Sequence, residues 1–364
     1  MFICNVVGAR PNFMKIAPVV LETQRRGIRQ LLVHTGQHYD RQMSAVFFEE
    51  LGMPAPDIHM GIGSGSHAEQ TARIMISFEK ICAENAFDLV VVGGDVNSTA
   101  ACSLVAAKMG IPVAHVEAGL RSFDRTMPEE INRIVTDHLS ELLFTTEESA
   151  NENLRREGIA EERIRFVGNC MIDTLRTHVE AALSRSPWEE YGIEPNQYVL
   201  LTLHRPSNVD DAIKLHLLMD IMHEVSLRMP VVFPAHPRTL DRIRQGNIQV
   251  PPSVRVCEPM PYLTFLGLLA KAKCVLTDSG GIQEETTALN IPCLTLRENT
   301  ERPVTLTRGT NRLVGTDVRK INAGIDEIMA GKWPNARQPL LWDGKAAHRI
   351  VDAVEAWAAP LNLR

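Results

Sequence analysis

Residues 115–133 read HVEAGLRSFDRTMPEEINR, and here an apolar run ends and a series of charged residues begins. The apolar run 113–116 is typical of a buried strand, and Glu117 stands where that run ends. Pro128 suits the first turn of a helix, and the glutamates after it suit the positive N-terminal end of that helix. In open α/β sheets, ligands bind outside the carboxyl ends of the strands, so chemistry is expected at Glu117.

Two explanations compete for the acidic residues of this region. A charge pattern that merely starts a helix accounts for Glu129 and Glu130. It does not account for Glu117, because a carboxylate on the end of a buried strand needs a compensating partner or a function. Asp95 follows an apolar run and a glycine pair, and it either caps the next helix or faces a ligand. Because Glu117 and Glu129 are further acidic candidates, we interpret Asp95 as catalytic.

Short apolar runs alternate with amphipathic segments along the chain. This alternation predicts parallel, doubly wound sheets, and therefore an α/β fold. The expected strands are 2–7, 31–35, 89–92, 113–116, 142–145, 164–167, 199–203, 231–233, 254–257, 274–277, 293–296 and 312–314. The expected helices are 13–26, 41–51, 67–84, 98–109, 129–140, 147–157, one from Asp173, 211–228, 261–271, 281–290, 318–330 and 345–358. Ser66-His67-Ala68-Glu69 is a capping box that opens the third of these helices.

The alternation loosens at 171–197, where proline and serine indicate turns, and then it starts again. We therefore expect two Rossmann-like domains, residues 1–172 and residues 173–344, facing each other across a cleft. The first domain would carry the catalytic carboxylates. The last helix is expected to return to it, which assigns residues 345–364 to the first domain.

Composition limits the kinds of partner. The chain of 364 residues has 38 basic and 44 acidic side chains, for a net charge of −6. This balance argues against nucleic acid or an anionic membrane as the main partner, so an anionic ligand requires a local cluster of cations. The seven cysteines form no C-x-x-C pair, and no signal-peptide pattern or apolar run of transmembrane length occurs. We expect reduced cysteines and a cytoplasmic protein.

Cations follow the first strand of each expected domain. Arg10 and Lys15 come after Gly8, at the start of a helix. Cations beside the positive end of a helix are unfavourable without an anion, so we interpret them as an anion site rather than as solvated charges. His204 and Arg205 end the first strand of the second domain, where they suggest a phosphate contact or a proton donor. A lone histidine is more often structural, and only its position favours a function here.

The clearest ligand signal of the second half lies at residues 277–285. A strand ends, Gly280 and Gly281 let the backbone approach a ligand, and a helix begins after Ser279 with its amides available. Glu285 lies one turn inside that helix, where a carboxylate can accept ribose hydroxyls. Arg302 supplies another cation in a loop after the next strand. A nucleoside diphosphate fits this arrangement better than a purely structural glycine turn.

Taken together, these motifs resemble those of the non-hydrolysing UDP-N-acetylglucosamine 2-epimerases, a family that shares the two-domain GT-B fold. The resemblance covers nearly the whole chain. It rests on Gly8-Ala9-Arg10-Pro11, Thr35-Gly36-Gln37-His38, Gly94-Asp95, His115-Val116-Glu117-Ala118-Gly119-Leu120-Arg121, Pro128-Glu129-Glu130, Asn132-Arg133, His204-Arg205, Ser279-Gly280-Gly281, Gln283-Glu284-Glu285 and Thr300-Glu301-Arg302-Pro303.

The resemblance implies specific roles for these residues. Acid and base candidates are Asp95, Glu117 and Glu129. It places Arg10, Lys15 and His204 around the diphosphate, and it assigns UDP binding to Ser279, Gly280, Gly281, Glu285 and Arg302. The implied reaction breaks the bond from C1 to UDP, removes the C2 proton to give a glycal, and returns a proton on the opposite face. It requires neither a nicotinamide cofactor nor a metal, and the family implies a homodimer.

Two departures from the family pattern leave alternatives open. Pro206-Ser207-Asn208 stands where many members have Arg-Glu-Asn. Tyr39-Asp40, in a longer loop after His38, resembles members that act on UDP-2,3-diacetamido-glucuronate, which leaves the substituents at C3 and C6 of the sugar open. The other candidates are a GT-B glycosyltransferase that uses a UDP-sugar, a hydrolysing epimerase, and a non-catalytic UDP-sugar-binding regulator. The first of these needs an acceptor site and does not need three carboxylates.

Overall fold

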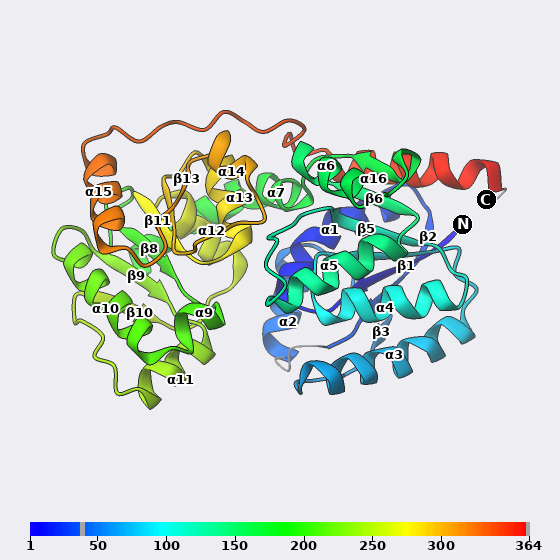
Figure 1. Cartoon of the computed structure of the whole chain (residues 1–364), viewed down its shortest axis with the longest axis horizontal. Helices are drawn as coiled ribbons and strands as arrows, with labels where there is room; N and C mark the ends of the chain where they lie inside the picture. The colour runs from blue at the N-terminus through cyan, green and yellow to red at the C-terminus, as the bar shows by residue number, and fades with distance from the viewer. Residues whose placement is uncertain (37–40, 362–364) are drawn as a thin grey trace. The chain divides into compact units, whose positions relative to one another are not determined.

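The computed structural model describes residues 1–36 and 41–361, with only the backbone described at residue 10 and residues 41–45 (Figure 1). The chain forms two compact units, which are Met1–Thr177 with the segment from Leu340 onward, and His178–Pro339. These boundaries lie a few residues from the predicted ones, because helix α7, Cys170–Ser184, runs on from the first unit into the second. The observed boundary lies in the middle of α7, whereas the predicted boundary lies near the start of this helix.

The first unit contains a seven-stranded parallel sheet in the order β3-β2-β1-β4-β5-β6-β7. Its strands are β1 Phe2–Val7, β2 Arg29–His34, β3 Ile58–His59, β4 Leu89–Gly93, β5 Val113–Ala118, β6 Leu142–Thr145 and β7 Ile164–Phe166. Its helices are α1 Arg10–Arg25, α2 Arg41–Glu50, α3 His67–Glu84, α4 Asn97–Lys108, α5 Pro128–Leu139, α6 Glu148–Arg156 and α16 Ala346–Ala358, with short turns of 3-10 helix at Glu161–Arg163 and Ala359–Leu361. The sequence did not predict β3, which has only two residues and no periodicity to detect.

The second unit repeats this architecture with a six-stranded parallel sheet in the order β10-β9-β8-β11-β12-β13. Its strands are β8 Val199–Thr202, β9 Val231–Pro234, β10 Val254–Cys257, β11 Cys274–Thr277, β12 Cys293–Thr295 and β13 Asn311–Leu313. Its helices are α8 Pro187–Glu190, α9 Pro206–Val209, α10 Ala212–Ser226, α11 Pro237–Gln245, α12 Tyr262–Ala270, α13 Gly280–Leu289, α14 Val304–Thr307 and α15 Val318–Met329. The predicted α/β fold with two doubly wound sheets is confirmed.

Strand order determines where ligands can bind in each unit. In the first sheet β2 lies on one side of β1 and β4 lies on the other, so the strand order reverses between β1 and β4. In the second sheet the strand order reverses in the same way between β8 and β11, and each reversal is a topological switch point. Loops diverge above such a switch point and leave a crevice at the carboxyl ends of the strands. The turns after β1 and β4, and those after β8 and β11, therefore adjoin the two expected ligand positions.

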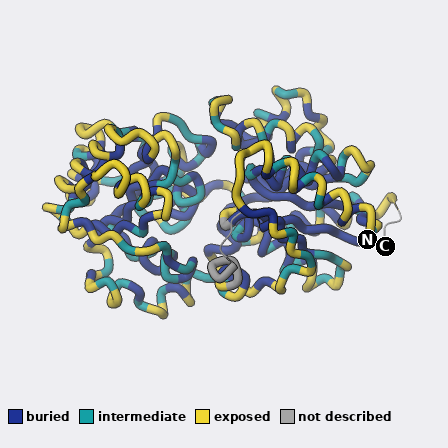
Figure 2. Tube along the Cα trace, turned by 90° about the horizontal axis from the view of Figure 1, so that it is seen from below, coloured by how far each residue is buried: buried dark blue, intermediate teal, exposed yellow. Residues whose placement is uncertain are grey.

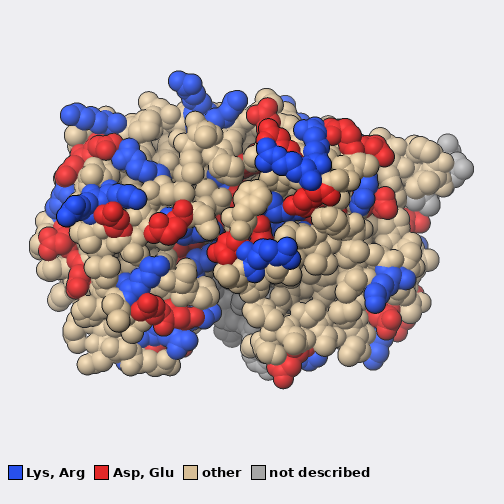
Figure 3. All heavy atoms as spheres, viewed as in Figure 1, with Lys and Arg blue, Asp and Glu red and all other residues tan. Residues whose placement is uncertain are grey.

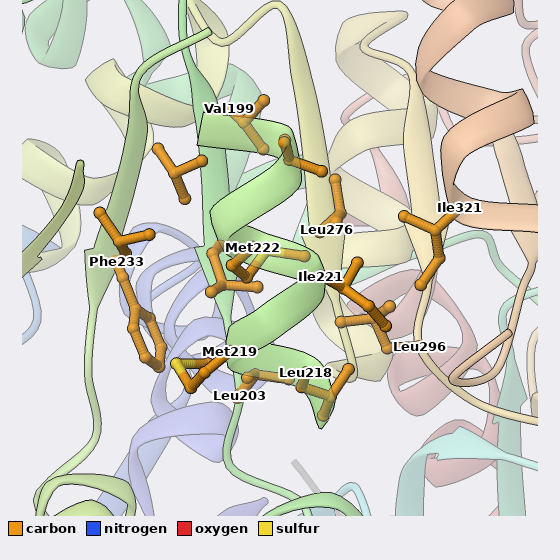
Figure 4. Packing of buried hydrophobic residues seen from close by; sticks show 14 of the residues in the cluster. Val199, Leu203, Leu218, Met219, Ile221, Met222, Phe233, Leu276, Leu296 and Ile321 are labelled. Carbon is orange, nitrogen blue, oxygen red and sulfur yellow. The ribbon is translucent and has the colours of Figure 1, made fainter. Parts of the chain in front are cut away.

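The interior of each unit is buried, as the dark blue stretches of the trace in Figure 2 show. In the second unit, α10 packs six apolar side chains into the core, and Figure 4 labels Leu218, Met219, Ile221 and Met222 among them, near Phe233 and Leu276. Around the surface seen in Figure 3, acidic and basic side chains are interspersed. None of the helices in residues 1–36 and 41–361 has the length and apolar character needed to cross a membrane.

The C-terminal helix packs in the first unit, along α1 (Figure 1). The Asp173 carboxylate accepts hydrogen bonds from the Ala346 and Ala347 amides at 3.1 and 2.8 Å, and so caps α16 from another helix. Burial raises the pKa of this carboxyl to about 6. The fully buried Trp342 donates its indole N–H to the Thr146 carbonyl at 2.9 Å. These contacts anchor the segment that returns from the second unit.

Replacing Leu218 with alanine tests the packing of the second unit. This side chain is fully buried on α10, whereas Ile213 on the same helix is 84% exposed. We expect Leu218→Ala to lower the free energy of unfolding by about 2–5 kcal/mol, because it leaves a cavity. The matched variant Ile213→Ala should change it by less than about 0.5 kcal/mol. Equal unfolding midpoints for the two variants in urea would contradict this packing.

Candidate active site

Glu117 stands in a β-bulge at the carboxyl end of β5. The pairing of β5 with β6 shifts its register between Val116 and Ala118, so Glu117 is the extra residue. Its φ of 73° lies in the left-handed region, which costs a residue with a side chain about 1–3 kcal/mol. Bulges of this kind redirect a side chain near a functional site. The surrounding structure therefore holds Glu117 in a strained, specific position.

Lys15 forms an ion pair with Glu117. Its Nζ lies 2.6 Å from Glu117 Oε1, and both side chains are buried. Gly94, at the end of the neighbouring strand β4, has a φ of 64°, and a Cβ there would lie 2.8 Å from Lys15 Nζ. A larger residue at Gly94 would therefore displace the lysine. The structure brings Lys15, predicted to contact the diphosphate, directly beside a predicted catalytic carboxylate.

Arg133 joins Asp95 to Glu130. Its Nη2 lies 2.6 Å from Asp95 Oδ2 and its Nη1 lies 2.7 Å from Glu130 Oε2, and the guanidinium is fully buried. Glu129 is half-buried and lies one turn before Arg133 on α5, so the two side chains share a face of that helix. The structure therefore places Asp95 and Glu129 in one neighbourhood.

The adjacent glutamates of α5 have different surroundings. The Glu130 carboxylate accepts hydrogen bonds from the Ser122 and Phe123 amides, each at 2.9 Å, besides its contact with Arg133. It holds the loop between β5 and α5 and is almost completely buried. Glu130 is thus a structural residue, whereas Glu129 is only half-buried.

His115 fixes the turn that carries Asp95. Its Nδ1 lies 2.6 Å from Asp137 Oδ1, and its Nε2 lies 2.8 Å from the Gly94 carbonyl oxygen. Both of these oxygens can accept a hydrogen bond from the ring. Burial disfavours ionisation of Asp137, but His115 and Arg121 outweigh it and hold the pKa of that carboxyl below its usual value. No role for His115 was predicted from the sequence, although a histidine inside an apolar run was a signal.

In the second unit, Asp278 joins β11 to the residues that follow β8. Its fully buried carboxylate accepts from the His204 and Arg205 amides and lies 2.9 Å from His204 Nδ1. Burial opposes ionisation, but the charge and hydrogen bonds of His204 and the two amides lower the pKa of Asp278. The His204 side chain remains 41% exposed. No role for Asp278 was predicted from the sequence, although it directly follows the buried strand β11.

Helix α13 begins at this switch point. Its N-cap Ser279 accepts no hydrogen bond from the first turn through its side chain, so the amides of that turn are not capped in this way. A Cβ on Gly280 would lie 2.3 Å from Arg302 Nη1. Glycine is therefore required for the Arg302 guanidinium to approach the helix start. Amides and a guanidinium at one helix N-terminus form a binding position for an anion.

A buried cluster of charges surrounds Arg302. Its Nε lies 2.9 Å from Glu284 Oε1, and its Nη1 lies 2.5 Å from Glu301 Oε1. Glu301 also contacts Arg297 at 2.8 Å and Arg205 at 3.5 Å. Three guanidinium groups thus face two carboxylates, which leaves a formal excess of one positive charge. Arg297 and Glu301 were not predicted to belong to the site.

Glu285 is fully buried on α13. The Tyr262 hydroxyl donates to its Oε1 at 3.2 Å. Burial raises the pKa of Glu285 to about 8, despite this hydrogen bond. The carboxyl is therefore mostly protonated at pH 7, and it can both donate and accept a hydrogen bond.

Some predicted residues lie outside the described part of the structure. The side chain of Arg10 and all of residues 37–40, which include Tyr39 and Asp40, are among them. Gly281 lies in the first turn of α13, as expected. Among residues 1–36 and 41–361, no group of three or more His, Cys, Asp or Glu side chains is arranged to hold a metal ion.

Comparison with known proteins defines the class and the family. The two parallel sheets with these loops define an α/β protein of the GT-B class. The family described as UDP-N-acetylglucosamine 2-epimerase matches residues 21–355, and the chain belongs to this family. A UDP-N-acetylglucosamine 2-epimerase of Methanocaldococcus jannaschii is 42% identical over 355 residues, 95% of this chain and 96% of that protein. The family resemblance noted in the sequence is thus confirmed.

Two further matches bear on the substrate. The crystal structure of the Methanocaldococcus jannaschii UDP-GlcNAc 2-epimerase in complex with UDP-GlcNAc and UDP has a TM-score of 0.91 and 40% identity, with 98% of this chain and 100% of that chain covered. A UDP-2,3-diacetamido-2,3-dideoxy-D-glucuronate 2-epimerase of Pseudomonas aeruginosa is 37% identical over 359 residues, 97% of this chain and 99% of that protein.

The buried Glu285 predicts a pH dependence of stability. Its folded pKa of about 8 lies above the ordinary value of 4.5, so the folded protein keeps this proton to higher pH than the unfolded chain. The free energy of unfolding should therefore fall as the pH rises from about 4.5 to about 8, and this contribution should level off above. In Glu285→Gln this contribution to the fall should be absent.

Urea unfolding of wild type and Glu285→Gln at pH 5 and pH 9, without nucleotide, measures this effect. The exposed residue of the same unit, Glu224, provides the control variant Glu224→Gln, which should follow the wild type. An identical pH dependence of wild type and Glu285→Gln would contradict the assignment.

Proposed function

We propose that the protein catalyses the reversible C2 epimerisation of UDP-N-acetylglucosamine to UDP-N-acetylmannosamine, by elimination and re-addition of UDP. This would supply precursors of surface polysaccharides. The observation that carries the proposal is the start of α13, where Gly280 leaves room for the buried Arg302 guanidinium beside the amides of the first turn. Family membership and the Methanocaldococcus jannaschii structure with UDP-GlcNAc and UDP support the choice of nucleotide.

The second unit would bind the nucleotide. The amides of the first turn of α13 and the Arg302 guanidinium suit the diphosphate, because both provide donors to phosphate oxygens. Arg205, with its partner Glu301, adds a cation at the neighbouring strand end. The protonated Glu285 would hydrogen-bond a ribose hydroxyl. Lys15 and Arg10 of the first unit are proposed as further diphosphate contacts.

The reaction itself follows from the chemistry of the sugar. The C2–H bond has no neighbouring carbonyl, so a base alone cannot ionise it. If the C1–O bond breaks first, its electron pair leaves with UDP and the developing oxocarbenium ion acidifies C2–H. A carboxylate then takes the C2 proton, and the electrons of that bond form the C1=C2 double bond of a glycal. Re-addition of UDP to C1, with proton delivery to the opposite face of C2, gives the epimer.

The first unit would supply the groups that move the proton. Asp95, Glu117 and Glu129 are the candidates, and two of them on opposite faces of the sugar suffice. His204 of the second unit would donate to the departing phosphate oxygen, where charge develops. No step requires a nicotinamide or a metal ion.

We further propose that the enzyme works in the cytoplasm as a homodimer. Seven free thiols, six of them buried, suit a reducing compartment. The homodimer rests on the resemblance to the family, and sedimentation at micromolar concentration tests it.

Proton NMR of the enzyme with UDP-N-acetylglucosamine in D₂O, without added cofactor, tests the reaction. We expect UDP-N-acetylmannosamine to appear, with deuterium at C2 of both sugars. Free N-acetylmannosamine together with UDP would instead indicate a hydrolysing epimerase. No change would exclude this substrate, and turnover of UDP-2,3-diacetamido-glucuronate would then assign the chain to the activity of the Pseudomonas aeruginosa relative.

The two adjacent glutamates of α5 provide a matched pair of variants. Glu129→Gln should lower kcat by about 10²-fold or more, because the residue would act on the substrate. Glu130→Gln should lower the melting temperature, since it weakens the contacts to Ser122, Phe123 and Arg133. Full activity of Glu129→Gln would remove this residue from the mechanism.

A further inference from the structure

We propose that Asp278 is a positioning residue that fixes His204 as its Nδ1–H tautomer and leaves Nε2 to exchange a proton with the substrate. The proposal rests on the proposed function for the catalytic use of Nε2. The tautomer itself depends only on the geometry of the two residues.

Strand pairing brings the two residues together. β8 and β11 are neighbours in parallel register, with Thr202 opposite Thr277. The chain then places Asp278 directly after β11 and His204 two residues after β8. His204 Nδ1 lies 2.9 Å from Asp278 Oδ1. The contact therefore follows from the register of the sheet rather than from a flexible loop.

The Asp278 carboxylate can only accept hydrogen bonds. It receives them from the His204 amide at 3.2 and 3.1 Å, from the Arg205 amide at 3.0 Å and from Asn208 Nδ2 at 3.2 Å. These donors and the fully buried position keep its orientation fixed. Because the carboxyl is held ionised by a lowered pKa, the nitrogen that faces it must carry a proton.

With Nδ1 facing Asp278, the form that Nε2 presents to a ligand is defined for both the neutral and the cationic ring. With the proton on Nδ1, the neutral ring presents the Nε2 lone pair, and the cationic ring presents Nε2–H. A proton given from Nε2 to the departing phosphate oxygen can be taken back by Nε2 when UDP re-adds to C1, so the cycle is balanced. A buried carboxylate that orients a histidine in this way also stabilises the imidazolium.

The first test needs no variant at Asp278. In protein labelled with ¹⁵N at its 12 histidines, the ring signals that disappear in His204→Gln are those of His204. Their long-range proton–nitrogen correlations distinguish the two tautomers. We expect a protonated Nδ1 at every pH at which the ring is neutral. The Nε2–H tautomer, which free histidine favours, would overturn the proposal whether or not the protein is an epimerase.

The second test is a double-mutant cycle with Asp278→Asn and His204→Gln. Asp278→Asn should lower kcat by roughly 10²-fold or more, with the affinity for UDP within about twofold of the wild type. In the His204→Gln background the same substitution should have little further effect on kcat, because Asp278 acts through the ring. Independent, multiplicative effects would show that Asp278 only supports the fold. A wild type without epimerase activity would disprove the proposed function and leave the tautomer result standing.

Discussion

Parallel pairing of strands is the constraint on which the rest of this structure depends. It places all carboxyl ends at one edge of each sheet, where the turns can carry charged side chains toward a ligand. At the edge of the first sheet, Lys15 and Glu117 pair at 2.6 Å. At the edge of the second, Asp278 meets the backbone and ring of His204. The two units thus share one architecture, with a Lys–Glu pair at the end of β5 in the first and a His–Asp pair beyond β8 and β11 in the second.

Burial gives these groups their properties. Water would screen the contacts of Arg133 with Asp95 and Glu130, but the guanidinium is almost completely excluded from solvent. Burial also raises the pKa of Glu285 to about 8, while Asp278, equally buried, has a lowered pKa because His204 and two amides donate to it. Environment rather than residue type therefore decides which carboxyl carries a proton. The strained backbone at Glu117 fits a position that is held for a function.

The sequence predicts the fold well because short buried strands and amphipathic helices differ in period. The capping box at Ser66 is confirmed, with Glu69 N 3.2 Å from Ser66 Oγ. Partners of the site residues could not be predicted in the same way. The pairing of Lys15 with Glu117 and of Asp278 with His204 joins residues 102 and 74 positions apart, and only the strand order brings them together. Glu129 and Glu130 look alike in sequence, yet one holds a loop and the other is half-buried.

The central claim is that UDP leaves C1 before the sugar is epimerised. Positional isotope exchange tests it directly, with UDP-N-acetylglucosamine that carries ¹⁸O in the oxygen between C1 and the β-phosphorus. If UDP departs and re-adds, rotation of the β-phosphate should move the label into the non-bridging positions at a rate comparable with epimerisation. Both changes can be followed by ³¹P and proton NMR in one sample. Epimerisation with the label retained in the bridge would contradict the account.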